Sequence, residues 1–154
     1  MSPRRSAGLL LWRRTGSGPE VLIAHMGGPL WAAKDEHAWT IPKGEYGEGE
    51  DALAAARREF AEELGSPVPD GELVALGEVR QRSGKIVTAW ALEADFDTTT
   101  VVSNTVEIEW PRRSGRRLRV PEIDRAAWVE PETARVKLVA AQGAFLDRLP
   151  RVLS

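Results

Sequence analysis

Short apolar runs separated by glycine- and proline-rich turns dominate the beginning of the sequence. Residues 6–13 (SAGLLLWR) and 21–24 (VLIA) are two such runs, and a turn at residues 15–19 joins them. This arrangement predicts two neighbouring antiparallel strands. Residues 39–41 predict a short third strand, which ends at Pro42 because proline has no N–H to donate to a sheet.

Between Gly49 and Gly65 the apolar spacing changes to that of a helix. Apolar residues recur three or four positions apart and fall on one stripe: Leu53, Ala56, Phe60 and Leu64. Acidic residues at the start of this segment favour the positive end of the helix dipole, and Gly65 favours a left-handed stop at the other end. The segment is therefore the clearest helix in the sequence.

Strand patterns return after this helix, and a second helical pattern closes the chain. Further strands are expected over residues 72–80, 85–96, 105–110, 117–120 and 126–129. Pro131 favours a helix start, and apolar residues at helical spacing predict a closing helix over residues 136–149. The order of strands, helix, strands and helix predicts an α/β fold with a mixed β-sheet, in a single domain over residues 1–154.

Composition narrows the chemistry that this domain can perform. The 154 residues contain no cysteine, which excludes disulfides, thiolate zinc sites and a cysteine nucleophile. With only two histidines, a histidine-rich metal site is not expected. Any chemistry therefore has to use carboxylates, arginine, lysine and the backbone.

Charge and hydropathy limit the partners. The 21 Lys and Arg residues nearly balance the 23 Asp and Glu residues, so binding to nucleic acid is not expected. The apolar run at residues 9–12 is far shorter than a membrane span or the core of a signal peptide. We therefore expect a cytoplasmic protein that does not associate with a membrane, and homo-oligomer formation stays open.

Three carboxylates lie close together on the first predicted helix. Glu59, Glu62 and Glu63 stand at i, i+3 and i+4, which places them on one side of the helix within one turn. Each like-charged i,i+4 pair costs roughly 0.2–0.5 kcal/mol. A hard divalent cation such as Mg²⁺ or Mn²⁺ would offset this repulsion. From the triplet alone, the alternative is an acidic helix face in contact with water.

The triplet belongs to a longer pattern. Gly44 is followed after five residues by Glu50 and, after seven more, by residues 58–65 with the sequence REFAEELG. This pattern resembles the signature of the Nudix family, in which the place held here by Ser66 is apolar and all fixed residue types match. That departure bears on packing rather than on ligands. The resemblance implies an α/β/α sandwich and a hydrolase that depends on Mg²⁺ or Mn²⁺.

The resemblance also implies roles for individual residues of the motif. The implied metal ligands are Glu59, Glu62, Glu63 and the carbonyl group of Gly44. The residues implied for catalysis are Glu50, Arg58, Glu62 and Glu63. The first two of these tie the motif loop to the helix, and either of the last two could help to deprotonate the attacking water. A base or extra ligand from outside the motif stays open, although each candidate could equally be a surface residue: Glu107, Glu109 and Glu122.

The implied reaction is the attack of water on a phosphoanhydride bond of a nucleoside diphosphate linked to a second group. Residues 39–44 (WTIPKG) look like the lead-in of dinucleoside polyphosphate hydrolases and of the diphosphoinositol polyphosphate group. Lys43 could hold a phosphate there, or it could be a solvated loop lysine. Arg112 and Arg116 lie in a basic turn that could bind substrate phosphate or form the solvated tip of a hairpin.

We therefore expect a small phosphorylated substrate, namely a nucleotide such as a dinucleoside polyphosphate or a nucleoside triphosphate. The alternatives are a diphosphoinositol polyphosphate hydrolase, a non-catalytic nucleotide-binding module of the same family and, less favoured by the balanced charge, an enzyme that removes RNA caps. The chain's only tyrosine, Tyr46, lies in the motif loop. Stacking on a nucleobase would therefore be absent or would fall to one of three tryptophans: Trp31, Trp90 or Trp110.

Overall fold

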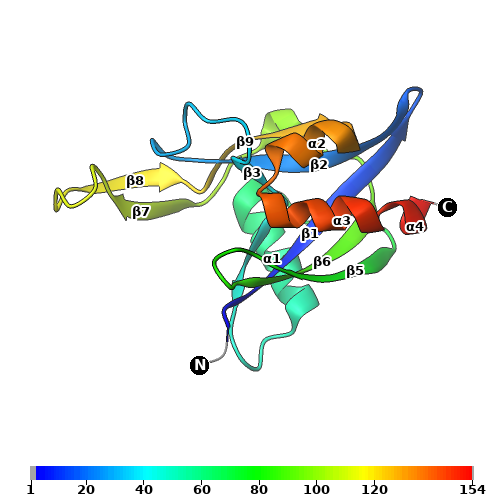
Figure 1. Ribbon diagram of the computed structural model, residues 1–154, viewed down its shortest axis with the longest axis horizontal. Coiled ribbons are helices and arrows are strands. Elements are labelled where there is room, and N and C mark those ends of the chain that lie inside the picture. Colours follow the sequence, from blue (N-terminus) through cyan, green and yellow to red (C-terminus); the bar gives the residue numbers. More distant parts are fainter. Residues whose placement is uncertain (1–2, 154) are drawn as a thin grey trace.

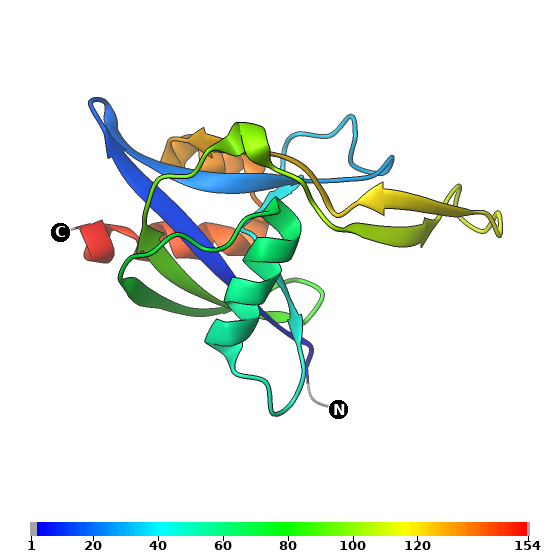
Figure 2. The same ribbon diagram turned by 180° about the vertical axis from the view of Figure 1, so that it is seen from behind.

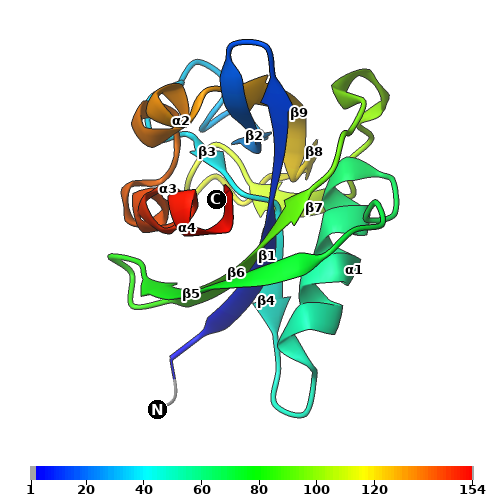
Figure 3. The same cartoon turned by 90° about the vertical axis from the view of Figure 1, so that its right-hand side faces the viewer.

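The apolar run near the start of the chain becomes the central strand of a layered fold. The computed structural model describes residues 3–153, so residues 1, 2 and 154 of the predicted domain lie outside the described part. In β1 (Arg5–Thr15), every residue from 6 to 12 is buried. A strand buried on both faces needs cover on both, and Figures 1 and 3 show α1 on one side of the sheet and α2 and α3 on the other.

Seven strands form one mixed sheet around β1. Their order is β3-β2-β1-β6-β5, while β4 also pairs with β1 and β9 pairs with β2. β1 and β6 run parallel, whereas the other pairs of this sheet are antiparallel. The antiparallel pairing of β1 with β2 confirms the prediction from the first two apolar runs. The strands that join β1 are β2 (Gly18–Met26), β3 (Trp39–Thr40), β4 (Lys43–Tyr46), β5 (Leu73–Arg80), β6 (Ile86–Glu93) and β9 (Ile123–Val129).

The helix α1 (Ala52–Leu64) forms where the helical pattern predicted it. Asp51 caps its start, because the Asp51 carboxylate accepts a hydrogen bond from the Ala54 N–H at 2.9 Å. Gly65 ends the helix with a φ of 77°, and its N–H donates to Ala61 O at 2.8 Å. The other helical elements are η1 (Thr98–Thr100), α2 (Pro131–Lys137), η2 (Ala140–Gln142), α3 (Gly143–Arg148) and α4 (Pro150–Leu153). Within residues 3–153, none of the helices is both long and apolar enough to cross a membrane.

Two apolar clusters, one on each face of the sheet, hold the layers together. Successive residues of β1 point to opposite faces, so Leu9 belongs to the cluster of Phe60 in α1 and Leu10 to the cluster of Phe145 in α3. Of the stripe predicted for α1, three residues are fully buried and Leu53 is partly buried. The predicted apolar face of α1 is thereby confirmed.

Some predicted boundaries are wrong. The closing helix predicted over residues 136–149 is divided, because the backbone of Leu138 is extended and the Val139 N–H donates to Trp39 O at 2.9 Å. The strand β4 follows Pro42 directly and pairs with β1, although the local pattern does not predict it. The strand predicted over residues 85–96 ends earlier, with β6. In the first two cases, hydrogen bonds to residues distant in sequence override the local spacing.

β7 (Thr105–Glu109) and β8 (Arg117–Pro121) form a separate hairpin that projects from the body of the fold (Figures 1 and 2). This pairing confirms the two strands predicted here. The Glu109 carboxylate accepts hydrogen bonds from the N–H groups of Arg113 and Gly115 at 3.0 and 3.2 Å. These bonds fix the conformation of the basic tip relative to the strands.

Candidate active site

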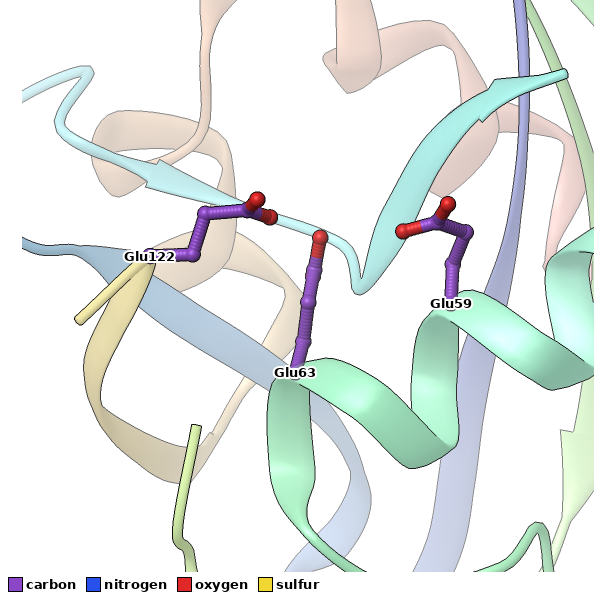
Figure 4. A group of neighbouring side chains, drawn as sticks. All are labelled: Glu59, Glu63 and Glu122. Carbon is purple, nitrogen blue, oxygen red and sulfur yellow. The ribbon is translucent and has the colours of Figure 1, made fainter. Parts of the chain in front are cut away.

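Three glutamates from two parts of the chain converge at one point. Glu59 and Glu63 lie one turn apart on α1, and Glu122 lies between β8 and β9 (Figure 4). One carboxylate oxygen from each residue lies within 4.8 Å of the others. Glu59 and Glu63 are only 8% and 3% exposed. Such a set of oxygen donors is suited to a hard divalent cation.

The predicted glycine of the motif makes room for this cluster. A Cβ atom on Gly44 would lie 2.0 Å from the carboxyl carbon and from Oε2 of Glu59. The next donor is fixed from the same strand, because the Lys43 N–H donates to Glu63 Oε1 at 3.2 Å. β4 therefore sets the positions of two of the three carboxylates.

We expect Gly44→Ala to weaken metal binding more than folding. The added methyl group would displace the Glu59 carboxylate, which can move without moving the backbone. The matched control is Gly47→Ala, since a Cβ at Gly47 meets nothing within 4 Å and neither glycine has a positive φ. Calorimetric titration with Mn²⁺ should show about a tenfold or greater loss of affinity for Gly44→Ala. Equal Mn²⁺ affinities in the two variants would contradict the assignment.

Arg58 ties the loop before α1 to the cluster. Its guanidinium donates to Glu50 Oε2 through Nε at 3.2 Å and Nη2 at 2.9 Å, and Nη1 donates to Glu59 Oε1 at 2.8 Å. The contact between Arg58 and Glu50 agrees with the pairing implied by the motif. Glu62 lies outside the three-residue cluster, with its side chain 43% exposed and Oε1 3.6 Å from Arg58 Nη1. The predicted ligand and catalytic roles of Glu62 stay predictions.

Glu122 is the member of the cluster that sequence reasoning left open. Its carbonyl accepts from the Gly27 N–H at 2.9 Å, and its own N–H donates to Asn104 O at 3.0 Å. The Asn104 N–H in turn donates to Glu62 O in the last turn of α1, at 2.9 Å. The backbone of Glu122 is thus fixed to both β2 and α1. The other two open candidates serve the hairpin, because Glu109 caps its tip and Glu107 lies 3.8 Å from Arg117.

Gly27 permits the close approach that brings Glu122 to the cluster. A Cβ at Gly27 would lie 2.1 Å from the carbonyl oxygen of Pro121. We therefore expect Gly27→Ala to push this backbone away and to cost about 1–3 kcal/mol of unfolding free energy. Gly16→Ala is the control, because a Cβ there meets nothing within 4 Å. Denaturant unfolding of both variants checks this, and equal midpoints would show that the contact can relax.

Burial changes the protonation of the cluster. It raises the pKa of Glu63 to about 9, and the hydrogen bond with Glu122 and the charge of that residue act in the same direction. Burial also raises the pKa of Glu59, against the effect of the Arg58 guanidinium. Near neutral pH, and without a bound cation, Glu63 therefore carries a proton. A cation would supply the positive charge that these buried carboxylates lack, so the donor set fits a divalent metal.

A cavity of about 820 Å³ opens beside the cluster. Its apolar walls come from the loop after β2 and from the projecting hairpin, with Leu30, Trp31, Ile108 and Trp110 among the lining residues. Of the tryptophans considered for stacking, Trp90 instead packs at the edge of the core beside α1.

The predicted substrate-binding residues do not all reach this cavity. Lys43 and Arg112 line it, whereas Arg116 does not belong to its lining within the described chain. Burial, together with the nearby Lys85 ammonium, lowers the pKa of Lys43. Lys43 is thus a partly buried cation within the cavity rather than a solvated loop lysine.

Comparison with known proteins agrees with this site. A model of the NUDIX domain matches residues 2–149, which is most of the chain. The chain belongs to the Nudix family. Enzymes of this family are hydrolases that cleave nucleotide pyrophosphate bonds and generally use divalent metals, and the chain is a Nudix hydrolase of this kind. No curated protein sequence gives a significant match to it.

Solved structures show the same fold. A C. elegans Ap4A hydrolase in a binary complex has a TM-score of 0.68 and 23% identity, covering 96% of this chain and 97% of that one. The NUDIX domain of Shewanella oneidensis NrtR complexed with ADP ribose has a TM-score of 0.66 and 12% identity, covering 100% and 90%. RenU, a Nudix hydrolase from M. smegmatis, has a TM-score of 0.56 and 22% identity, covering 99% and 88%. At these identities the likeness concerns the fold, and it confirms the predicted α/β sandwich with its mixed sheet.

Proposed function

We propose that this Nudix hydrolase uses Mg²⁺ or Mn²⁺ to cleave a nucleoside diphosphate linked to another group, and that dinucleoside polyphosphates are its preferred substrates. The observation that carries the proposal is the convergence of Glu59, Glu63 and Glu122 at the side of a large cavity with apolar walls. The carboxylates are suited to the cation that a phosphoanhydride needs, and the apolar walls are suited to a nucleoside.

The residues of the cluster have separate tasks in this proposal. Glu59 and Glu63, with the carbonyl of Gly44, hold the cation, and Arg58 keeps the Glu59 carboxylate in place. When bound, the cation neutralises charge on phosphate oxygens and makes a bound water more acidic. Glu122 lines the cavity and is less buried than its two neighbours, so its carboxylate is placed to accept the proton of the attacking water.

Lys43 and the apolar walls support the choice of substrate class. The Lys43 ammonium can attract the phosphates toward the cluster, as the resemblance of residues 39–44 to dinucleoside polyphosphate hydrolases suggested. Trp31 and Trp110 line the same cavity and offer flat apolar surfaces to a base. A diphosphoinositol polyphosphate has no such flat group and carries many phosphates, whereas Arg112 alone of the two predicted arginines lines the cavity.

A substrate panel tests the proposal. Diadenosine polyphosphates, nucleoside triphosphates, ADP-ribose and a diphosphoinositol polyphosphate are incubated with Mg²⁺ or Mn²⁺, and the products are separated by ion-exchange chromatography. We expect the highest kcat/KM for a diadenosine polyphosphate. Preferential cleavage of the diphosphoinositol would support the alternative hydrolase. Nucleotide binding without cleavage under either cation would support the non-catalytic module.

A further inference from the structure

The cavity has a second polar region beyond the acidic cluster. It extends past β4 to the face of the sheet that α2 and α3 cover, where its lining includes Ser6, Lys43 and Lys85. The sheet register places the first two on the same face, because Ser6 pairs with Glu45 and Gly8 pairs with Lys43. On the other side of β1, Ser6 pairs with Val87, so Lys85, two residues earlier, shares this face as well.

The Ser6 hydroxyl has no hydrogen-bond partner. Its residue is 0% exposed, and within the described chain Oγ meets no donor or acceptor. A buried polar atom left unpaired destabilises the folded state, so its presence beside a cavity indicates a partner that enters the cavity. A hydroxyl can donate to an anionic oxygen, which fits a ligand rather than a structural bond.

The two lysines nearby supply positive charge that the protein only partly balances. The Lys43 and Lys85 ammonium groups are close enough to repel each other. Lys85 Nζ lies 3.3 Å from Glu45 Oε2, and that carboxylate is 51% exposed. Lys85 also lines a second cavity of about 700 Å³, together with Arg4 and Arg80. A line of cations therefore leads away from the acidic cluster.

We propose that Lys43, Lys85 and the Ser6 hydroxyl form a phosphate subsite for a part of the substrate that lies outside the metal cluster. This inference rests on the proposed function, because it assigns an orientation to the same substrate. The nucleoside lies against the apolar walls, the cleaved bond lies at the carboxylates, and further phosphates extend over Lys43 toward Lys85. The ligand class is thus a phosphate chain longer than the diphosphate that the metal engages.

Binding of inorganic tripolyphosphate in EDTA tests this subsite apart from turnover. Without divalent metal the chain cannot be held through a cation at the carboxylates, and no hydrolysis is needed for a signal. By calorimetry we expect Lys85→Gln to weaken tripolyphosphate binding by about tenfold. Arg82→Gln is the matched control, because Arg82 is an exposed cation of the same turn that lines neither cavity; it should change binding by less than about twofold. Orthophosphate is titrated in parallel, and comparable affinity for it would mean that the subsite holds a single free phosphate rather than a chain.

Ser6→Ala provides a second variant that separates binding from folding. Because the hydroxyl has no partner in the protein, its removal should leave the melting temperature in EDTA unchanged or higher. We expect the same variant to weaken tripolyphosphate binding by about threefold. Equal affinities in the wild type, Lys85→Gln and Ser6→Ala, or no binding by the wild type, would overturn the subsite. Failure of the substrate panel with this binding intact would instead overturn the proposed hydrolysis.

Discussion

Glu63→Gln is expected to lower turnover by about a thousandfold or more while the protein stays folded. Glu63 lies at the centre of the cluster, between Glu59 and Glu122 (Figure 4), and it is the most buried of the three. A carboxamide cannot supply the negative charge that a divalent cation requires. Removal of this donor should therefore abolish tight metal binding and, with it, hydrolysis.

The same substitution is mild for the metal-free protein, which makes the result interpretable. With its pKa raised to about 9, Glu63 is already neutral at pH 7, and the carboxamide that replaces it is neutral too. The amide oxygen can still accept from the Lys43 N–H, and the amide nitrogen can donate to Glu122. We expect equal or higher melting temperatures for Glu63→Gln in EDTA. We also expect Mg²⁺ to stabilise the wild type but not the variant.

Steady-state kinetics with a diadenosine polyphosphate, and melting curves with and without Mg²⁺, measure these effects. Glu48→Gln is the matched control, because Glu48 is an exposed carboxylate in the motif loop and should keep wild-type turnover. Activity of Glu63→Gln within tenfold of the wild type would remove Glu63 from the site. Glu62→Gln belongs in the same series, since the motif predicts a ligand at Glu62 whereas the three-residue cluster does not include it.

The parts of the site that the sequence predicted are those whose geometry is local. One helix carries Glu59 and Glu63, so the i,i+4 spacing alone places them together. The fixed separation within the motif also brings Arg58 back to Glu50, at 2.9 Å. Gly65 ends α1 in the conformation that its residue type favours. In these cases neighbouring residues determine the structure, and a single sequence contains the necessary information.

Glu122 could not be chosen from the sequence over Glu107 and Glu109. All three are acidic residues near the hairpin strands, and no local spacing relates any of them to α1. The choice depends on how β8 crosses the end of β2, where Gly27 contacts the backbone before Glu122. The paired glycines after β2 were visible in the sequence as a loop signal. Their role as a contact surface required the tertiary structure.

The closing helix failed for the same physical reason. Its apolar residues do have helical spacing, and several of them are buried. However, Leu138 also forms a bridge with Trp39, and this pairing takes the backbone out of the helical conformation. Tertiary hydrogen bonds in this region outweigh the weak local preference for a continuous helix.

Metal affinity is expected to depend strongly on pH, and the direction follows from the Glu63 carboxyl. Its pKa rises from an ordinary 4.5 to about 9 in the metal-free protein, so metal binding at neutral pH must displace a proton. Affinity should therefore increase with pH, by about tenfold per unit while one proton is released. The stability of the metal-free protein has the opposite sign. A raised folded pKa contributes stability that is fully present below pH 4.5 and is lost as pH rises toward 9.

Calorimetric titration with Mn²⁺ at pH 6 and pH 8 measures this dependence, and an increase in affinity of about a hundredfold is expected. Repeating the titration at pH 7 in buffers of different ionisation enthalpy should show the release of about one proton per bound ion. Glu48→Gln should retain the full pH dependence, because Glu48 is exposed and lies outside the cluster. Affinity that is constant between pH 6 and pH 8 would mean that Glu63 is ionised before the cation arrives. The burial argument would then be wrong, because the carboxylates would tolerate their mutual repulsion without a shared proton.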